Sequence, residues 1–366
     1  MRKLMLIFGT RPEAIKMAPL VQEMRRRGTF DVHVTVTGQH REMLTSVLET
    51  FGIVPDTSLD LLSPGQTLDA LHTRILAETG RVMDAERPDA VLVHGDTTTA
   101  LASSLAAFYR GIPVCHVEAG LRTYRTDAPF PEESNRHAID TVSALCFAPT
   151  EDAAANLRRE GKSEDAVFVT GNTGIDALSW SMKQKAPDLP EIPDGKRLVL
   201  LTAHRRENLA SLEALLRAIR AVIEEMPDVF CIYPVHRNPA VREAANRAFA
   251  GCRDVMLKEP MPLVPFQHLL SRAYVALTDS GGLQEEAPAL GVPVLVMRDF
   301  TERPEGVRAG SIRLVGTSPT SVAAALREML RDESMHREMS RVSFPFGEGG
   351  ASARIADILE ARFPEI

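Results

Sequence analysis

Short apolar segments rich in β-branched residues alternate with segments of helical periodicity along this 366-residue chain. Residues 90–93 and 112–117 have the length and branching of strands that are buried on both faces, and residues 98–110 between them have helical spacing. A strand, a helix and a second strand in this order form one unit of a parallel sheet. Further strand and helix segments of this kind on both sides predict a doubly wound α/β fold.

Carboxylates follow both strands of this unit. The first strand runs into HGD and the second into HVEAG, so Asp96 and Glu118 come where the strands end, and a later PFPEE segment adds Glu132 and Glu133. In an open parallel sheet, ligands bind beyond the carboxyl ends of the strands, so Asp96 and Glu118 are expected to project into one crevice. A single acid at such a place is equally typical of a helix cap. Two acids at neighbouring strand ends favour an acid/base site.

The chain is expected to form two domains, because single hydrophobic cores stop growing near about 250–300 residues. The segment QKAPDLPEIPDGK contains three prolines and five charged side chains without periodicity, which is typical of a linker. A second series of alternating strands and helices follows it. The predicted parts are an N-terminal Rossmann-like domain with the carboxylates, a linker, a C-terminal Rossmann-like domain and a C-terminal helix, at residues 1–183, 184–196, 197–350 and 351–366.

Composition excludes several classes of protein. The formal net charge is −7, which disfavours nucleic acid as a partner because that partner needs a basic face. There is no N-terminal apolar segment and no apolar run of about 18 residues, so neither a signal peptide nor a membrane span is predicted. The four cysteines form no CxxC pair. This favours reduced thiols in a cytoplasmic protein over disulfides or a metal site.

Two cations lie near the start of the helix that follows the first predicted strand, residues 3–8. The turn reads GTRPEAIKMAPL and lacks GxGxxG, so no dinucleotide cofactor is predicted. Arg11 and Lys16 are typical of anion binding, because backbone N–H groups and cations there face the same way. The alternative is a pair of solvated surface side chains. Gln39 and His40, in TGQHREM after the second predicted strand, are further candidates that could equally cap or solvate the next helix.

Histidines follow two strands of the second domain. In AHRREN, His204 and Arg205 come directly after a predicted strand, at the expected start of a helix. His236, in YPVHRNP, also follows a strand, although the Asn-Pro after it is typical of a simple turn. On residue type alone, a structural role stays open for both histidines.

The segment TDSGGLQEEAP has the pattern of a phosphate site. A strand is predicted to end at Asp279, Ser280-Gly281-Gly282 to form a tight turn, and a helix to follow. The glycines let the backbone approach a phosphate, while Ser280 and the N–H groups of the helix can donate to it. One helical turn further on, Glu286 can reach a vicinal diol, as ribose-binding acids do. Strand, turn and acid together predict a nucleotide site.

The chain resembles the non-hydrolysing UDP-N-acetylglucosamine 2-epimerases from residue 5 to about residue 315. The motifs that carry the resemblance stand in the family's order: GTRPEAIKMAPL, TGQHREM, HGDTTT, VEAGLRT, PFPEESNR, HRREN, YPVH, DSGGLQEEAP and VMRDFTERPE. The resemblance implies a GT-B architecture, in which two Rossmann-like domains face a cleft and the final helix can cross back to the first. It also implies a UDP-sugar substrate and a homodimer.

The resemblance implies roles for individual residues. Catalytic roles fall on Asp96, Glu118, Glu132 and His204. Contacts to UDP fall on Arg11, Ser280, Gly281, Gly282, Glu286 and Arg303. Two places depart from the family: FPFGEGG stands for the usual Asn-Pro-Tyr-Gly-Asp-Gly, which leaves its contacts open, and Gly65 stands where some members have an arginine for a second, activating substrate molecule.

The chemistry that the resemblance implies needs paired carboxylates. The C2–H of UDP-GlcNAc is not next to a carbonyl, so simple enolisation is not available, and no nicotinamide fingerprint is present to oxidise C3. Elimination of UDP to a glycal, followed by re-addition, requires acid/base groups on opposite ring faces, which Asp96, Glu118 and Glu132 can supply. The alternatives are a hydrolysing epimerase, a GT-B glycosyltransferase that uses a UDP-sugar, and a non-catalytic nucleotide-sugar-binding protein.

Overall fold

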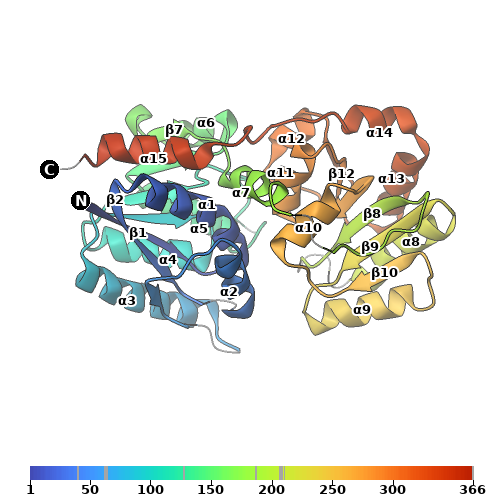
Figure 1. Ribbon diagram of the computed structural model, residues 1–366, viewed down its shortest axis with the longest axis horizontal. Helices are drawn as coiled ribbons and strands as arrows, with labels where there is room; N and C mark the ends of the chain where they lie inside the picture. Colours follow the sequence, from blue (N-terminus) through green and yellow to red (C-terminus); the bar gives the residue numbers. More distant parts are fainter. Residues whose placement is uncertain are drawn as a thin grey trace. The chain divides into compact units, whose positions relative to one another are not determined.

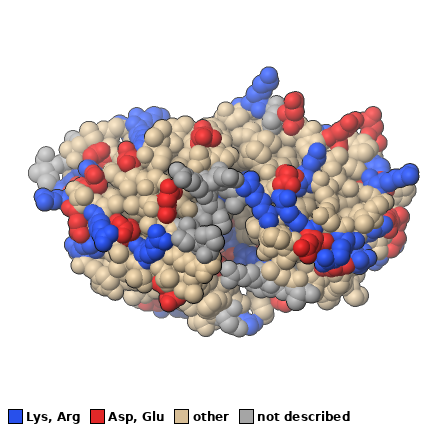
Figure 2. All heavy atoms as spheres, turned by 90° about the horizontal axis from the view of Figure 1, so that it is seen from below, with Lys and Arg blue, Asp and Glu red and all other residues tan. Residues whose placement is uncertain are grey.

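The computed structural model describes the backbone of residues 1–38, 41–61, 65–126, 128–185, 188–205, 209 and 211–364, and the side chains of all of these except 41–43. The chain divides into two compact units, Met1–Trp180 with Phe346–Ile366, and Ser181–Pro345 (Figure 1). None of the helices in the described ranges is long and apolar enough to cross a membrane. On the face shown in Figure 2, Lys and Arg side chains are interspersed with Asp and Glu side chains.

The first unit contains a parallel sheet with the strand order β3-β2-β1-β4-β5-β6-β7. Its strands are β1 (Arg2–Phe8), β2 (Phe30–Val36), β3 (Thr57–Ser58), β4 (Ala90–His94), β5 (Val114–Val117), β6 (Leu145–Ala148) and β7 (Val167–Val169). Its helices are α1 (Arg11–Arg27), α2 (Arg41–Thr50), α3 (Leu68–Glu86), α4 (Thr98–Phe108), α5 (Glu132–Val142), α6 (Glu151–Arg159), the 3₁₀ helix η1 (Glu164–Ala166), α7 (Thr173–Met182) and α15 (Ala351–Arg362). Helices α3 and α4 lie on one side of this sheet and α1 and α15 on the other (Figure 1).

The second unit repeats this plan with the strand order β10-β9-β8-β11-β12-β13, again with parallel neighbours. Its strands are β8 (Arg197–Thr202), β9 (Val229–Pro234), β10 (Val255–Lys258), β11 (Val275–Thr278), β12 (Val294–Val296) and β13 (Ile312–Leu314). Its helices are α8 (Leu212–Glu224), α9 (Pro239–Phe249), α10 (Leu263–Leu270), α11 (Gly281–Ala289), α12 (Pro304–Arg308), α13 (Pro319–Arg331) and α14 (Glu333–Met339). The predicted class, two doubly wound α/β sheets, is confirmed.

Helix ends follow the local rules of capping. Thr10 caps α1 and forms a capping box with Glu13, and Gly28 ends the helix with a left-handed φ of +67°. Thr97 and Thr150 cap α4 and α6 through bonds from backbone N–H groups, as the sequence predicts for Thr150. These caps place the first turns of the helices directly beyond the strand ends.

The strand order of each sheet reverses at one point. This point lies between β1 and β4 in the first unit and between β8 and β11 in the second. The turns that follow such a strand pair lie side by side at the carboxyl edge of the sheet, where open α/β sheets bind ligands. In this chain they are the turns that contain Gly9, Asp96, His204 and Ser280.

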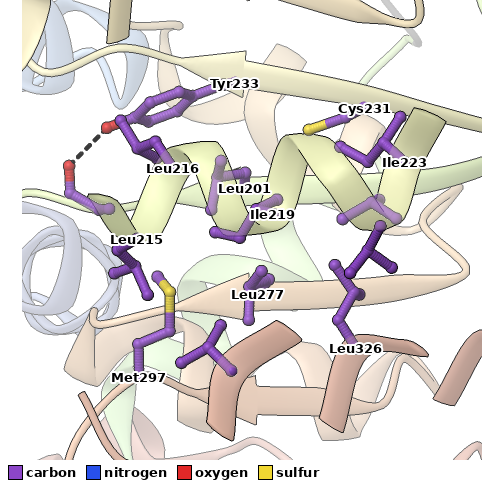
Figure 3. Close-up of a cluster of buried hydrophobic side chains, with 14 of the residues drawn as sticks. Leu201, Leu215, Leu216, Ile219, Ile223, Cys231, Tyr233, Leu277, Met297 and Leu326 are labelled. Atoms are coloured by element: carbon purple, nitrogen blue, oxygen red, sulfur yellow. Dashed lines mark hydrogen bonds between the residues drawn. The ribbon is translucent and has the colours of Figure 1, made fainter. Parts of the chain in front are cut away.

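A large apolar core supports the second of these edges. The α8 side chains Leu215, Leu216 and Ile219 are fully buried among residues of β8, β9 and β11 (Figure 3). The Tyr233 hydroxyl, also buried, donates to the carbonyl of Ala203 at 2.7 Å. This hydrogen bond satisfies the polar end of a core side chain and fixes the chain just where β8 ends.

The segments between and after the two domains have defined places. Leu189 and Ile192, from the predicted linker, pack against the core of the second unit. Helix α15 belongs to the first unit, where Asp357 pairs with Arg27 of α1 at 2.6 Å. The short edge strand β3 is not predicted by the sequence, because its two residues carry no apolar alternation.

Candidate active site

Asp96 is held in place by helix α5. Its carboxylate Oδ2 accepts a hydrogen bond from Arg136 Nη2 at 2.5 Å, and its backbone carbonyl accepts one from Asn135 Nδ2 at 2.8 Å. The turn begins at Gly95, whose φ of +64° suits glycine. The side chain of Asp96 is 27% exposed. The carboxylate is therefore oriented by a cation and still reachable by a ligand.

Glu118 follows β5 directly and has a φ of +66°, in the left-handed region that non-glycine residues rarely adopt. Its Oε2 contacts Lys16 Nζ, accepts from Asn172 Nδ2 at 3.0 Å and lies 3.8 Å from His94 Nε2. Such backbone strain persists only where surrounding contacts hold it, typically at functional sites. Lys16, nearly buried, thus pairs with a predicted catalytic acid.

The two glutamates at the start of α5 differ in their surroundings. Glu133 is fully buried, and its Oε1 accepts from the backbone N–H groups of Thr123 at 2.9 Å and Tyr124 at 2.7 Å. Its Oε2 lies 3.1 Å from Arg136 Nη1. Glu132 is only half-buried. Glu133 therefore fixes the preceding loop, and Glu132 is the neighbour with exposed surface.

Glu13 joins the two turns at the point where the first sheet reverses its order. Its Oε2 accepts from the backbone N–H groups of Gly9 at 3.1 Å and Thr10 at 2.7 Å, and its Oε1 accepts from Thr97 Oγ1 at 2.7 Å. Burial raises the pKa of Glu13, against the opposing effect of these hydrogen bonds. Arg11, the half-buried first residue of α1, lies beside this turn at the positive end of the helix.

A buried histidine–aspartate pair lies beneath the carboxylates, and the sequence reasoning missed it. His116 is inside β5, with Nδ1 2.6 Å from Asp140 Oδ1 and Nε2 2.7 Å from the carbonyl oxygen of Gly95. A histidine buried within an apolar strand is expected to have hydrogen-bond partners. The partner lies on α5, far along the chain, and only the tertiary fold identifies it.

Asp279 joins the corresponding turns of the second sheet. Its Oδ2 accepts from the backbone N–H groups of His204 and Arg205, both at 2.9 Å, and its Oδ1 lies 3.2 Å from His204 Nδ1. Burial alone would raise the pKa of Asp279, but the hydrogen bonds and charge of His204 hold it below its ordinary value. The rings of His204 and His236 stack, with centroids 5.2 Å apart. His204 and Arg205 lie in no helix or strand, and the helix expected to open at HRREN falls largely on residues 206–208 and 210, outside the described residues.

The predicted phosphate turn opens helix α11. Ser280 is the residue before the helix and makes no side-chain cap, so its half-buried hydroxyl is not used by the first turn. A Cβ added at Gly282 would meet no described atom within 4 Å, so the turn has open space beside it. Glu285 is 1% exposed, whereas Glu286 is half-buried. Glu286 is therefore the more accessible acid of this pair.

Arg303 lies against this turn and not in solvent. Its guanidinium pairs with Glu285 at 2.6 Å and with Glu302, and the side chain is nearly buried. A Cβ at Gly281 would come within 2.9 Å of Arg303 Nη1. The arginine therefore supports the glycine turn from one side, whatever it contributes to a ligand directly.

Two other predicted features have definite outcomes. Gln39 and His40 lie outside the described residues. The divergent FPFGEGG segment joins the first unit at Phe346, which is fully buried and whose carbonyl accepts from the backbone N–H of Asn172 at 2.9 Å. Within the described ranges, no group of three or more His, Cys, Asp or Glu side chains is placed to hold a metal ion.

Two doubly wound parallel units, with carboxylates at the strand ends of one and a glycine turn opening a helix in the other, define a nucleotide-sugar enzyme of the GT-B class. The profile of the family described as UDP-N-acetylglucosamine 2-epimerase matches residues 22–360. The chain belongs to this family.

Individual relatives match over nearly the whole chain. The UDP-N-acetylglucosamine 2-epimerase of Bacillus subtilis (strain 168) is 49% identical over 98% of this chain and 94% of its own. The crystal structure of UDP-GlcNAc 2-epimerase from Neisseria meningitidis bound to UDP-GlcNAc has a TM-score of 0.95 and 43% identity, over 98% of this chain and 100% of that one. The co-structure of S. aureus MnaA with UDP has a TM-score of 0.95 and 45% identity, over 100% and 98%.

Proposed function

We propose that this protein interconverts UDP-N-acetylglucosamine and UDP-N-acetylmannosamine by eliminating UDP to a glycal and adding it back, without net hydrolysis. The observation that carries the proposal is the pair of acids at adjacent strand ends, Asp96 beside Arg136 and Glu118 beside Lys16. Family membership supports the substrate, since structures of relatives contain UDP-GlcNAc or UDP.

The stereochemistry explains why more than one acid is needed. In the gluco isomer, C2–H and the α-linked UDP are both axial and anti, whereas in the manno isomer they are gauche. The C2 proton is therefore removed from one ring face and returned on the other, which one carboxylate cannot do. Asp96, Glu118 and Glu132 supply three carboxylates in one unit, and Asp96 and Glu118 each contact a cationic side chain.

The second unit is proposed to hold the nucleotide and its diphosphate. His204, Arg205 and the N–H groups at the start of α11 are the donors for the leaving phosphates, and Glu286 is the acceptor for the ribose hydroxyls. Fixed donors of this kind stabilise the negative charge that develops as the C1–O bond breaks. Arg11, at the start of α1, is a further candidate for a contact to UDP.

The proposal includes the oligomeric state and the cellular location of the protein. Family resemblance supports a homodimer. A cytoplasmic location is supported by the four free cysteines and by substrates that are charged nucleotide sugars. Sedimentation equilibrium measures the first of these expectations directly.

Proton NMR of UDP-GlcNAc incubated with the pure protein tests the proposal. New UDP-ManNAc signals at a stable ratio to substrate, with no free sugar, are the expected result, and EDTA should leave the rate unchanged. Free ManNAc with UDP would instead identify a hydrolysing epimerase. Line broadening of UDP-GlcNAc without any product would identify a binding protein.

A further inference from the structure

Asp140 is a buried carboxylate that contacts the Glu118 turn directly and is linked to the Asp96 turn through His116. We propose that Asp140, acting in part through His116, is a positioning residue that sets the two catalytic acids relative to each other. This inference rests on the proposed function of those acids. Neither Asp140 nor His116 reaches the reacting atoms, because both are almost fully buried.

The contact to the Asp96 turn runs through the imidazole ring. Asp140 Oδ1 lies 2.6 Å from His116 Nδ1, and His116 Nε2 lies 2.7 Å from the carbonyl oxygen of Gly95. A carbonyl only accepts, so Nε2 carries a proton and donates to it. The carbonyl of Gly95 is the peptide group directly before Asp96. The ring is thus a strut between α5 and the Asp96 turn, and its Nε2 is not available as a general base.

The contact to the Glu118 turn is direct. Asp140 Oδ2 accepts from the backbone N–H of Gly120 at 3.2 Å and from Arg122 Nη2 at 2.7 Å. Gly120 ends the turn in which Glu118 adopts its left-handed backbone, with a φ of +84° of its own. Asp140 therefore uses Oδ1 for the link through His116 to the Asp96 turn and Oδ2 for the Glu118 turn.

Helix α5 joins these contacts to the third acid. It begins at Glu132, and its Asn135 and Arg136 make the two direct bonds to Asp96. A rigid helix that carries one acid and binds the turns of the other two fixes all three against the sheet. Breaking the buried anchor frees the turns while leaving the acids themselves unchanged. Displacements of about 1 Å are enough to cost roughly 10²-fold in rate.

A matched pair of substitutions at His116 separates the hydrogen bond to the Gly95 carbonyl from the contact to Asp140. The amide nitrogen of glutamine can occupy the place of Nε2 and donate to the Gly95 carbonyl, whereas that of asparagine reaches only the place of Nδ1. His116→Gln should keep kcat within about tenfold of wild type, and His116→Asn should lose roughly 10²-fold in kcat with KM changed less than about threefold. UDP affinity, by calorimetry, should be the same in both.

Amide hydrogen exchange gives a readout that does not depend on activity. Peptides that contain Gly95 and Gly120 should exchange at least about tenfold faster in His116→Asn than in wild type or His116→Gln. Glu160→Gln is the control. It neutralises the carboxylate that pairs with Arg122 at the outer end of the network, and it touches neither turn. Its kcat and exchange should match wild type.

The outcomes are distinct. Equal kcat and equal exchange in the two His116 variants would overturn the positioning role. If His116→Asn does not fold, Asp140→Asn decides, because its amide can accept hydrogen bonds on one side only: faster exchange of the Gly95 or Gly120 peptide together with a roughly 10²-fold loss of kcat supports the positioning role, and wild-type exchange with wild-type kcat contradicts it. Wild-type protein without epimerase activity would overturn the proposed function, while the exchange data would still decide the role of Asp140 and His116.

Discussion

Replacing Arg303 by alanine should destabilise the protein as well as weaken UDP binding. Arg303 is 6% exposed, with Nε 2.6 Å from Glu285 Oε1, and Glu285 is 1% exposed. Glu302 keeps a second cation, Arg298, at 3.0 Å, so the main loss falls on Glu285. Removing one partner of a buried ion pair costs about 3–5 kcal/mol, because the remaining charge stays in a medium of low polarity.

Scanning calorimetry measures this loss. For a unit of 150–250 residues, 3–5 kcal/mol corresponds to a fall in Tm of roughly 6–20 °C. The matched control is Arg308→Ala, an exposed arginine of α12, which should change the free energy of unfolding by less than about 0.5 kcal/mol. The double variant Arg303→Met with Glu285→Leu should recover part of the loss, since it removes both charges. A Tm for Arg303→Ala within about 2 °C of wild type would refute this reading of the ion pair.

Three further substitutions test the packing and the charges. An alanine Cβ at Gly9 would lie 2.1 Å from Thr37 Oγ1. Gly9→Ala should therefore lower the free energy of unfolding, measured with urea, by about 1–3 kcal/mol. A change near zero would show that the turn can move. Gln267 is fully buried, and neither its Nε2 nor its Oε1 has a hydrogen-bond partner among the described residues; Gln267→Met should therefore stabilise by about 1–3 kcal/mol, and a lower Tm would contradict this. The pKa of Asp279 is depressed below 3.8. The ionised carboxylate therefore stabilises the folded protein above about pH 3.8, and this stabilisation is lost as the pH falls through the folded-state pKa. Asp279→Asn should flatten the fall of Tm in this acidic range, and an unchanged slope would exclude Asp279 as a cause.

The fold is largely readable from the sequence because parallel sheets bury both faces. Strands such as β1, with Leu4–Phe8 fully buried, appear as continuous apolar runs, and helix caps such as Thr150 mark where helices begin. The edge strand β3 escapes this reasoning because two residues, Thr57–Ser58, carry no pattern. Which helix supports which strand end is likewise a matter of tertiary packing.

The site is readable to the extent that it follows strand ends. Asp96 and Glu118 come from that rule, but the choice between Glu132 and Glu133 does not. Two adjacent glutamates look alike in the sequence. The structure distinguishes them, because Glu133 accepts a hydrogen bond from the backbone N–H of Thr123 in the preceding loop. A charged residue in a polar segment is expected at the surface, so burial such as that of Arg303 has no sequence signal.

The fate of the C2 proton tests the central claim most directly. In D₂O, wild-type protein should place deuterium at C2 of the UDP-ManNAc that it forms, as seen by loss of the C2 proton signal. Asp96→Asn and Glu118→Gln should lose about 10²–10⁴-fold in this incorporation, the usual range for removing a general acid or base, while still binding UDP. Product that keeps its original hydrogen at C2, or full turnover in both variants, would contradict the assignment of these carboxylates to proton transfer.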